Sequence, residues 1–142
     1  MIRALLLCMA LCLPGGARAG LNELTAHDVA QIRAVIHRQI DAFRRDDARG
    51  AFALVSPGVQ EEFGTPERFL DVMRVSYRPV YRSSAVAFLG LTVLGRDAVQ
   101  HVQLTDRSGA LWHAYYAMQR QDDGSWRTNG CRLVQLSKTI PT

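Results

Sequence analysis

The sequence predicts an α+β domain in which three N-terminal helices pack on a curved, four-stranded antiparallel sheet. Between residues 25 and 78, apolar side chains recur every three or four positions, which is the spacing of one helix face. From Ser84 onward, apolar and polar side chains alternate, as they do along a strand. Because short turn sequences separate the alternating segments, adjacent strands are expected to be antiparallel.

The first helix is predicted from the periodicity that follows Thr25. Its apolar stripe consists of Val29, Ile32, Ile36, Ile40 and Phe43. Thr25 and Asp28 have the spacing of a capping box, in which each side chain accepts a hydrogen bond from a free amide of the first turn. We therefore expect the helix to begin after Thr25, and its stripe to be covered by the second half of the chain.

A second, short helix is expected directly after the first. Asp46 or Asp47 can cap it, because an aspartate oxygen accepts hydrogen bonds from free amides at a helix start. The side chains that it would bury are Phe52, Leu54 and Val55. We expect Ser56-Pro57-Gly58 to end it and residues 59–64 to form a polar turn anchored by Phe63.

The third helix has the strongest start signal in the chain. In Thr65-Pro66-Glu67, threonine can cap the helix and proline suits its first position. The negative charge of Glu67 is favourable near the positive N-terminal end of the helix dipole. The apolar positions that follow at helical spacing are Phe69, Leu70, Met73 and Tyr77. Pro79 is expected to end this helix, which leaves Tyr81 in the link to the sheet.

The four strands are predicted at residues 85–94, 98–105, 110–121 and 126–136. Their joints are Gly95-Arg96, Asp106-Arg107-Ser108-Gly109 and Asp122-Asp123-Gly124-Ser125. Each joint has turn chemistry and is short enough for a hairpin. Closing each hairpin symmetrically places Leu91 opposite Gln100 and Gln100 opposite Tyr115. The same rule places Tyr115 opposite Arg132.

This register divides the strand residues between two faces. The face expected to meet the helices carries Leu89, Leu91, Val93, Val102, Leu104, Leu111, Tyr115, Val134 and Leu136. The opposite face carries Phe88, Thr92, His101, Gln103, Trp112, Tyr116, Asn129 and Cys131. The second face holds more aromatic side chains than an ordinary solvent-exposed surface does.

Residues 1–19 have the features of a secretory signal peptide. Arg3 supplies the positive flank, residues 4–13 form an apolar stretch too short for a membrane anchor, and Ala17-Arg18-Ala19 fits the cleavage rule. We therefore expect cleavage after Ala19, a periplasmic or secreted protein without a stable membrane span, and one domain over residues 20–142. An uncleaved anchor is the alternative reading.

Charge and cysteine content argue against nucleic-acid binding, disulfides and thiol catalysis. Loss of Arg3 and Arg18 with the signal peptide leaves 15 basic and 13 acidic residues, a surplus too small to favour nucleic acid. Cys131 would then have no cysteine partner, so a buried structural thiol is expected rather than a disulfide or a nucleophile. The histidines match no metal-ligand spacing and no cofactor motif is present, so no metal and no cofactor are expected.

Three segments carry a resemblance to a known family: QIDAFRRDDARGAFALVSP, FGTPERFLDVMRVSYRPVYR and DGSWRTNGCRLV. They are similar to a bacterial family known as domain of unknown function 4864, over about residues 28 to 136. The order of helices and strands also resembles the nuclear transport factor 2-like superfamily, the fold of ketosteroid isomerase and scytalone dehydratase. That resemblance implies a cystatin-like cone, but the superfamily includes enzymes, binding modules and dimerisation domains. An isomerase-type site would need an acidic base in the cone, and the predicted register directs no Asp or Glu there.

Polar residues at one end of the expected core face suggest a ligand pocket. The candidate pocket residues are His113, Tyr115, Arg132, Gln100, Tyr77 and Tyr81. Donors beside apolar side chains suit a small apolar or acidic ligand, and Arg132 can bind a carboxylate through two hydrogen bonds. Tyr77 and Tyr81 can close the cone. The alternative is ordinary packing, with the histidine and tyrosine hydrogen-bonded near the sheet edge.

The aromatic outer face suggests a contact surface. The candidate interface residues are Phe88, His101, Trp112 and Tyr116. Aromatic side chains on an open sheet favour a partner, and a homodimer through this face is the expectation. The alternative is that the C-terminal residues 137–142 cover the face.

Two functions follow from these features. The first is an exported, non-catalytic module that binds a ligand in a conical pocket or interacts with a protein. The alternative is a cofactor-free isomerase, dehydratase or hydrolase that uses His113, Tyr115 and Arg132 in the cone.

Overall fold

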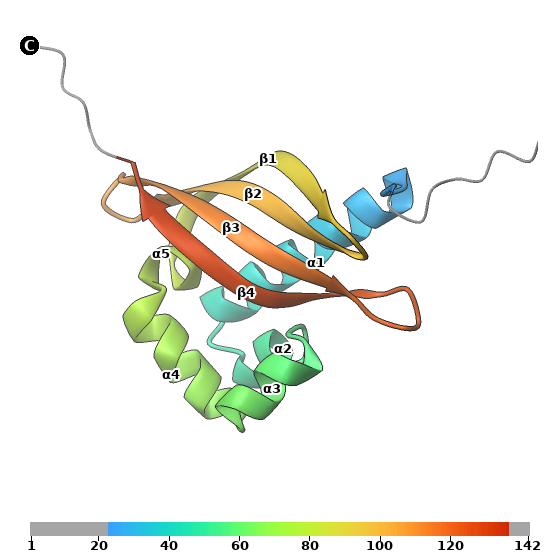
Figure 1. Cartoon of the computed structure of the whole chain (residues 1–142). Helices are drawn as coiled ribbons and strands as arrows, with labels where there is room; N and C mark the ends of the chain where they lie inside the picture. The colour runs from blue at the N-terminus through green and yellow to red at the C-terminus, as the bar shows by residue number, and fades with distance from the viewer. Residues whose placement is uncertain (1–22, 137–142) are drawn as a thin grey trace, which may run out of the picture.

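The computed structural model describes residues 23–136 and contains five helices followed by one four-stranded sheet (Figure 1). The helices are α1 (Ala26–Arg44), α2 (Ala48–Phe52), α3 (Pro57–Phe63), α4 (Pro66–Ser76) and α5 (Arg78–Tyr81). The strands are β1 (Ser83–Leu94), β2 (Asp97–Asp106), β3 (Leu111–Arg120) and β4 (Trp126–Gln135). The α+β class and the four antiparallel strands are confirmed. The predicted signal peptide and the C-terminal residues 137–142 lie outside the described residues.

Helix α1 begins as its sequence predicts. The hydroxyl of Thr25 accepts a hydrogen bond from the backbone N–H of Asp28 at 3.1 Å. Asp28 Oδ2 accepts one from the backbone N–H of Thr25 at 2.9 Å. This reciprocal pair is a capping box. Ile32, Ile36 and Ile40 are buried, so the predicted stripe lies in the centre of the core.

Helix α2 is also confirmed, with Asp47 as its cap. Asp47 Oδ1 accepts a hydrogen bond from the backbone N–H of Gly50 at 2.9 Å. Asp46 instead has a positive φ of 52° and its carboxylate binds Arg82. Val55 is buried after the helix, as predicted.

The prediction of a polar turn at residues 59–64 is wrong, because most of that segment belongs to α3. The Ser56 hydroxyl accepts a hydrogen bond from the backbone N–H of Val59 at 3.3 Å, and Pro57 occupies the first helical position. The same residues that stop one helix therefore start the next, since serine at the cap and proline after it favour a helix start.

Helix α4 begins as predicted, and a fifth helix follows it. The Thr65 hydroxyl accepts a hydrogen bond from the Arg68 N–H at 3.2 Å, with Pro66 in the first position. Pro79 does not lead directly into the sheet, because it lies in the first turn of α5, where its missing N–H costs nothing. Tyr81 belongs to α5 and is buried, which corrects its placement in a link.

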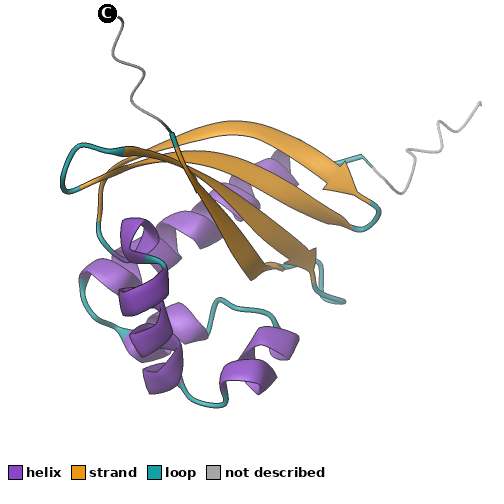
Figure 2. Ribbon diagram, turned by 60° about the vertical axis from the view of Figure 1, so that its left-hand side comes forward, coloured by secondary structure: helices purple, strands orange, loops and turns teal. Residues whose placement is uncertain are grey.

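The strands lie in chain order in one sheet, and every neighbouring pair is antiparallel. All five helices lie on one side of the sheet in Figure 1, and Figure 2 shows the sheet curving over α1. Residues 54–56 run beside β4, where the Ser56 N–H donates to Thr128 O at 2.8 Å. The Thr128 N–H donates to Leu54 O at 3.0 Å. These two bonds fix the link between α2 and α3 against the sheet.

The predicted register is confirmed for residues 91–94 in the first hairpin and for residues 112–117 in the third, but the central hairpin is shifted by one residue throughout. Leu91 pairs with Gln100, and Tyr115 pairs with Arg132, as predicted. Gln100, however, pairs with Tyr116 and not with Tyr115. Because side chains alternate between faces, this shift turns β3 and β4 over together relative to β2.

The cause of the shift is the connection between β2 and β3. The Asp106 N–H donates to Ala110 O at 2.9 Å, and the next pair is Thr105 with Leu111. Asp106 Oδ1 accepts hydrogen bonds from the backbone N–H groups of Ser108 at 2.9 Å and Ala110 at 3.0 Å. An aspartate that binds its own turn amides favours this longer connection.

Strand β1 contains a bulge that the sequence analysis missed. Phe88 pairs with Val102 and Leu91 pairs with Gln100, so the register shifts between them and β1 has one extra residue. Gln100 Nε2 donates to the carbonyl oxygens of Leu89 and Gly90, each at 3.2 Å. The bulge places Phe88 on the helix side and Leu89 on the outer side.

The predicted faces are therefore wrong for parts of three strands. Side chains that were expected on the helix side and lie on the outer side are Leu89, Leu111, Tyr115 and Val134. Side chains that were expected outside and pack in or against the core are Phe88, Trp112, Tyr116 and Cys131. Strand β2 keeps its predicted faces, with Val102 and Leu104 buried.

Asp28 joins α1 to the sheet in addition to capping it. Its Oδ1 accepts hydrogen bonds from Trp126 Nε1 at 3.1 Å and from Arg120 Nη1 at 3.2 Å. Burial raises the pKa of Asp28, but hydrogen bonds from Thr25 and Trp126 and the charge of Arg120 outweigh it and lower that pKa to about 2. The ionised carboxylate therefore holds the start of α1 against the end of the β3–β4 hairpin.

Candidate functional site

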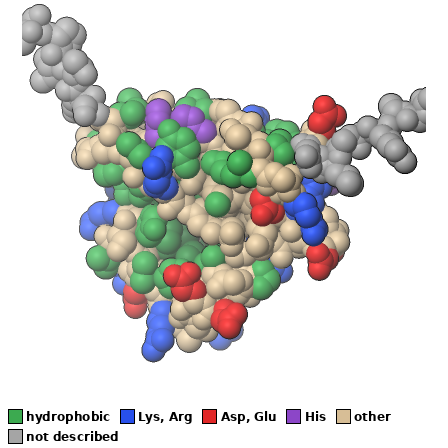
Figure 3. All heavy atoms as spheres, viewed as in Figure 1, with side chains coloured by type: hydrophobic (Ala, Val, Ile, Leu, Met, Phe, Trp, Pro, Cys, Tyr) green, Lys and Arg blue, Asp and Glu red, His purple; other side chains and the backbone are tan. Residues whose placement is uncertain are grey.

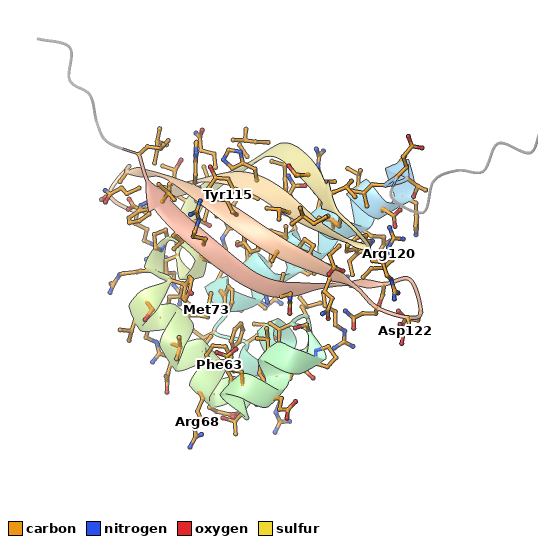
Figure 4. All side chains as sticks on the ribbon, viewed as in Figure 1. Phe63, Arg68, Met73, Tyr115, Arg120 and Asp122 are labelled. Carbon is orange, nitrogen blue, oxygen red and sulfur yellow. The ribbon has the colours of Figure 1, made fainter. Side chains whose placement is uncertain are left out.

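A pocket lies between helices α3 and α4 and strand β4, with a cavity volume of about 160 Å³. We call it the α4–β4 pocket. Its apolar lining residues are Val55, Val59, Phe63, Phe69 and Met73. Its other lining residues are Gln39, Glu62, Tyr77, Tyr116, Thr128, Asn129, Gly130 and Cys131. Figure 3 shows a hollow with apolar walls in this region, and Figure 4 shows Phe63 and Met73 between the helices and β4.

The helical wall depends on the joint between α3 and α4. Gly64 has a φ of 78°, a conformation that glycine adopts without strain, and it lets the chain turn sharply from α3 into α4. The turn brings the rings of Phe63 and Phe69 together, with 5.3 Å between their centroids. Met73 lies one turn further along α4 and is buried. These side chains form an apolar wall that faces the sheet.

The sheet wall depends on a bulge in β4. Ala117 pairs with Gly130 and Met118 pairs with Thr128, which leaves Asn129 as the extra residue. The Ser56 hydroxyl donates to Asn129 Oδ1 at 2.6 Å, so the bulge is tied to the start of α3. The bulge bends β4 at the point where the pocket opens.

Gln39 closes the inner end of the pocket. It is buried on α1, and its Nε2 donates to Ala51 O at 3.2 Å and to Thr128 Oγ1 at 3.1 Å. One side chain therefore connects α1, α2 and β4. Because both hydrogen bonds donated by the Gln39 amide go to protein acceptors, we expect this polar part of the pocket wall to be rigid.

Two neutral groups on the sheet wall decide the chemistry of the pocket. Tyr116 and Cys131 are paired across β3 and β4. The Tyr116 hydroxyl is buried and has no hydrogen-bond partner among the described residues. Burial, together with the nearby Cys131, raises the pKa of Tyr116 well above its usual value. Burial likewise raises the pKa of the Cys131 thiol to about 12.

At neutral pH, Tyr116 and Cys131 therefore keep their protons. A protonated thiol is a poor nucleophile and a protonated phenol is not a base, so these two groups are suited to binding and not to catalysis. The phenol can donate one hydrogen bond, and the surrounding wall is largely apolar. The arrangement suits a small apolar molecule that carries one hydrogen-bond acceptor.

Only one of the predicted pocket residues lines the α4–β4 pocket, namely Tyr77. The shifted register moves His113, Tyr115 and Arg132 to the outer face of the sheet. Gln100 is buried and binds the bulge of β1. Tyr81 donates a hydrogen bond to Asp46 and lies on the other side of α4 and α5.

The predicted interface residues are divided in the same way. Phe88 and Trp112 pack against the core, and Tyr116 is buried in it. His101 lies on the outer face, as predicted, because β2 keeps its predicted faces. The expected aromatic outer surface of Phe88, Trp112 and Tyr116 is therefore wrong as a description of that face.

The outer face carries a different cluster, which we call the histidine–tyrosine cluster: His101, His113, Tyr115 and Arg132. The rings of His101 and Tyr115 stack with 4.6 Å between centroids, and the rings of His101 and His113 lie 4.4 Å apart. Arg132 lies over the Tyr115 ring at 5.3 Å. Desolvation and the neighbouring His113 lower the pKa of His101. Figure 3 shows histidine atoms on this upper side of the molecule.

Within residues 23–136, no group of three histidine, cysteine or acidic side chains is arranged to hold a metal ion. None of the helices in this range has both the length and the apolar character required to cross a membrane.

The sequence analysis missed most of the α4–β4 pocket. The sequence predicts Phe63 as a turn anchor and Phe69 and Met73 as part of a helix face that packs on the sheet, and not as the wall of a pocket. The sheet lining was assigned to the wrong face because of the one-residue shift at the β2–β3 connection. A signal was available in Asp106, since an aspartate two residues before a serine often binds the turn amides and lengthens a hairpin loop.

The comparisons with known proteins give a family and nothing more specific. No curated protein and no solved structure is significantly similar to the chain. Residues 25–140 match the model of one family, which is described as Domain of unknown function (DUF4864). This range covers every helix and strand of the structure and most of the chain, as the resemblance of the three sequence segments predicts. The protein therefore belongs to the family described as Domain of unknown function (DUF4864).

Proposed function

We propose that this protein is an exported, non-catalytic binding module that holds a small, neutral, mostly apolar molecule in the α4–β4 pocket. The observation that carries the proposal is Tyr116, which lines the pocket and whose buried hydroxyl has no hydrogen-bond partner among the described residues. A buried hydroxyl without a partner is costly, and a ligand with an acceptor atom would remove that cost.

The size of the pocket supports a small ligand. Its volume of about 160 Å³ is close to that of cavities of roughly 150 Å³ that hold benzene. It is smaller than the pockets of about 300 to 1,000 Å³ that hold drug-sized molecules. A single six-membered ring with one carbonyl or ether oxygen therefore suits the space.

The charge of the lining supports a neutral ligand. Glu62, the one acidic lining residue, lies at the exposed side of the pocket and opposes an anion. Tyr116 and Cys131 are held in their neutral forms. The catalytic alternative required His113, Tyr115 and Arg132 inside the cavity, and their place on the outer face removes its support.

Export and superfamily membership are part of the same proposal. The composition of residues 1–19 supports a cleaved signal peptide and a periplasmic or secreted location. Helices that precede a curved antiparallel sheet, with a pocket between the two layers, support membership of the nuclear transport factor 2-like superfamily. The described cavity would then be the remaining space of its cone.

Filling the cavity tests the proposal. In Val59→Phe the added ring atoms should occupy the pocket, because Val59 lines it and is only partly buried. We expect cyclohexanone to shift the backbone amide signals of Met73, Tyr116 and Thr128 in NMR titrations of the mature protein. We expect Val59→Phe to weaken that binding at least tenfold while the melting temperature is unchanged or higher, because filling an existing cavity stabilises a fold.

Val75→Phe is the matched control, since Val75 is 79% exposed on α4 and is not part of this pocket. It should bind cyclohexanone as the wild type does. The proposal is wrong if the amide shifts occur elsewhere, or if both variants bind equally well.

A second candidate function is self-association through the outer face of the sheet. Leu89, Leu111 and Val134 are 38%, 39% and 41% exposed on that face. They lie around the histidine–tyrosine cluster, whose single permanent charge is on Arg132. Because the surface is apolar and nearly uncharged, two copies can approach without strong repulsion, so we propose a homodimer through this face.

Replacing Val134 by an acid tests the dimer. Val134→Asp should halve the molar mass measured by light scattering after size exclusion, because a buried carboxylate without a partner opposes association. Val72→Asp is the control, since Val72 on α4 is similarly exposed, at 37%, but lies on the helical side. A monomeric wild type, or equal masses for the wild type and Val134→Asp, would remove this candidate.

A further inference from the structure

A second and larger hollow lies on the other side of α4, between α4, α5 and the β2–β3 connection. Its volume is about 850 Å³, within the range of roughly 300 to 1,000 Å³ that is usual for small-molecule sites. Four arginines, Arg74, Arg78, Arg82 and Arg107, line it. We call it the arginine hollow.

The hollow carries a surplus of positive charge. Arg82 is paired with Asp46 at 2.9 Å, and Arg74 is paired with Asp71 at 3.1 Å. Among the described residues, no carboxylate forms an ion pair with Arg78 or Arg107. Two guanidinium groups therefore remain available to an anion.

The one carboxylate in the lining is already bound by its own turn. Asp106 Oδ1 accepts hydrogen bonds from the backbone N–H of Ser108 and Ala110 and from the Ser108 hydroxyl. Asp106 Oδ2 accepts one from Trp112 Nε1 at 2.9 Å. Hydrogen bonds from Ser108 and Trp112 lower the pKa of Asp106 to about 2, so the carboxylate is ionised while these bonds hold it to its own turn and to the indole.

Part of the cationic wall is held in place before any ligand binds. Two guanidinium groups lie over the Tyr81 ring, with the Arg82 carbon 3.9 Å and the Arg74 carbon 5.9 Å from its centroid. Arg82 also donates to the Phe43 carbonyl oxygen. These contacts fix Arg74 and Arg82 in the wall of the hollow, beside the exposed side chains of Arg78 and Arg107.

The opposite wall is apolar. Trp112 and Leu133 line the hollow from β3 and β4, and the hydrogen bond from Trp112 to Asp106 fixes the orientation of the indole. A flat aromatic surface facing several guanidinium groups suits a molecule with an apolar body and an anionic end.

We propose that the arginine hollow is a binding site for a small amphiphilic anion. The carboxylate or phosphate of the ligand binds Arg78 and Arg107 at the rim, and its apolar body packs on Trp112 and Leu133. This site is separate from the α4–β4 pocket, and the proposal does not depend on the function assigned to that pocket. The two sites differ in ligand class, since one suits a neutral molecule and the other an anion.

Calorimetric titration of the mature protein with 2-naphthoate tests the assignment, with 2-naphthamide as a neutral molecule of the same shape. We expect the carboxylate to bind at least tenfold more tightly than the amide. Raising the salt concentration should weaken the binding of the carboxylate and leave that of the amide unchanged. The double variant Arg78→Gln/Arg107→Gln should weaken naphthoate binding at least tenfold.

The control is Arg38→Gln/Arg68→Gln, which removes the same charge from exposed positions outside the hollow; Figure 4 shows Arg68 at the far end of α4. Equal affinity for naphthoate and naphthamide would overturn the proposal. Equal losses in the two double variants would also overturn it, because they would show attraction by net charge alone. Binding of anionic lipid vesicles through Arg78 and Arg107, without binding of naphthoate, would assign the face to a membrane and reject the small-molecule site.

Discussion

Asp28→Ala is expected to lower the free energy of unfolding by about 3 kcal/mol, the largest loss expected from removing one polar side chain of this domain. The carboxylate caps α1, and it accepts hydrogen bonds from Trp126 and Arg120 on the sheet. Its side chain is only 8% exposed, and its removal leaves the buried Trp126 Nε1 without an acceptor and Arg120, which is 28% exposed, without its ion-pair partner. Urea unfolding followed by circular dichroism measures the change.

Asp41→Ala is the matched control. Asp41 forms an ion pair with Arg44 at 3.3 Å, close to the 3.2 Å of the Asp28–Arg120 pair, but both side chains are largely exposed. Exposed pairs contribute less than about 1 kcal/mol, so this variant should be nearly as stable as the wild type. Similar losses in the two variants would contradict the role of Asp28 as the link between α1 and the hairpin.

The same carboxylate predicts a pH dependence whose sign follows from its pKa. That pKa is about 2 in the folded protein and 3.8 as a reference value, so the unfolded chain binds the proton first as the pH falls. The stabilisation is present above pH 4 and is lost between about pH 4 and pH 2. Because Arg120 is 28% exposed, solvent screens part of its charge interaction with Asp28, and we expect a contribution of about 1 to 2 kcal/mol. The stability difference between the wild type and Asp28→Asn should shrink over that range.

How far the sequence predicts this fold depends on where each signal lies. Capping residues act on the next three amides, so Thr25 and Thr65 located two helix starts from sequence alone, and the alternatives Asp46 and Asp47 restricted the start of α2 to two positions. The two-residue joint after β1 likewise fixed its hairpin register. In contrast, Ser56 lies after α2 and also caps α3. The local sequence shows that α3 can begin there, but not that the rest of the fold offers a surface on which α3 packs.

The candidate site was less predictable, because it depends on the register of whole strands. One extra residue in the connection at Asp106 exchanged the faces of β3 and β4, and the bulge after Phe88 exchanged part of β1. Tyr116, predicted on the outer face, therefore lines the pocket, and His113, predicted in the pocket, lies on the outer face. The apolar pattern did not prevent the error, since both faces of β3 carry large side chains.

The sequence contains one sign of the arginine hollow. Arg74, Arg78 and Arg82 are spaced four apart, and such residues lie along one side of a continuous helix. The chain breaks at Tyr77 between α4 and α5, yet all three arginines still line the same hollow. Arg107 joins them only through the tertiary fold, so the complete cluster required the structure.

Tyr116→Phe is expected to stabilise the free protein and at the same time to weaken ligand binding. Removing a buried hydroxyl that lacks a partner should raise the free energy of unfolding by roughly 1 to 2 kcal/mol, against the usual direction for a core substitution. If the ligand acceptor binds this hydroxyl, the variant should lose about tenfold in affinity for cyclohexanone. Its affinity for methylenecyclohexane, which has the same shape without the acceptor, should not fall.

Tyr115→Phe provides the control for both effects, because Tyr115 is the neighbouring residue on the outer face and stacks on His101. It should leave the binding of cyclohexanone unchanged and alter stability by less than about 0.5 kcal/mol. A loss of stability in Tyr116→Phe would mean that the hydroxyl is already satisfied in the free protein. An equal loss of affinity for both ligands would mean that packing, and not the hydrogen bond, decides binding. The first result removes the reason for a ligand acceptor, and the second assigns the pocket to a purely apolar molecule.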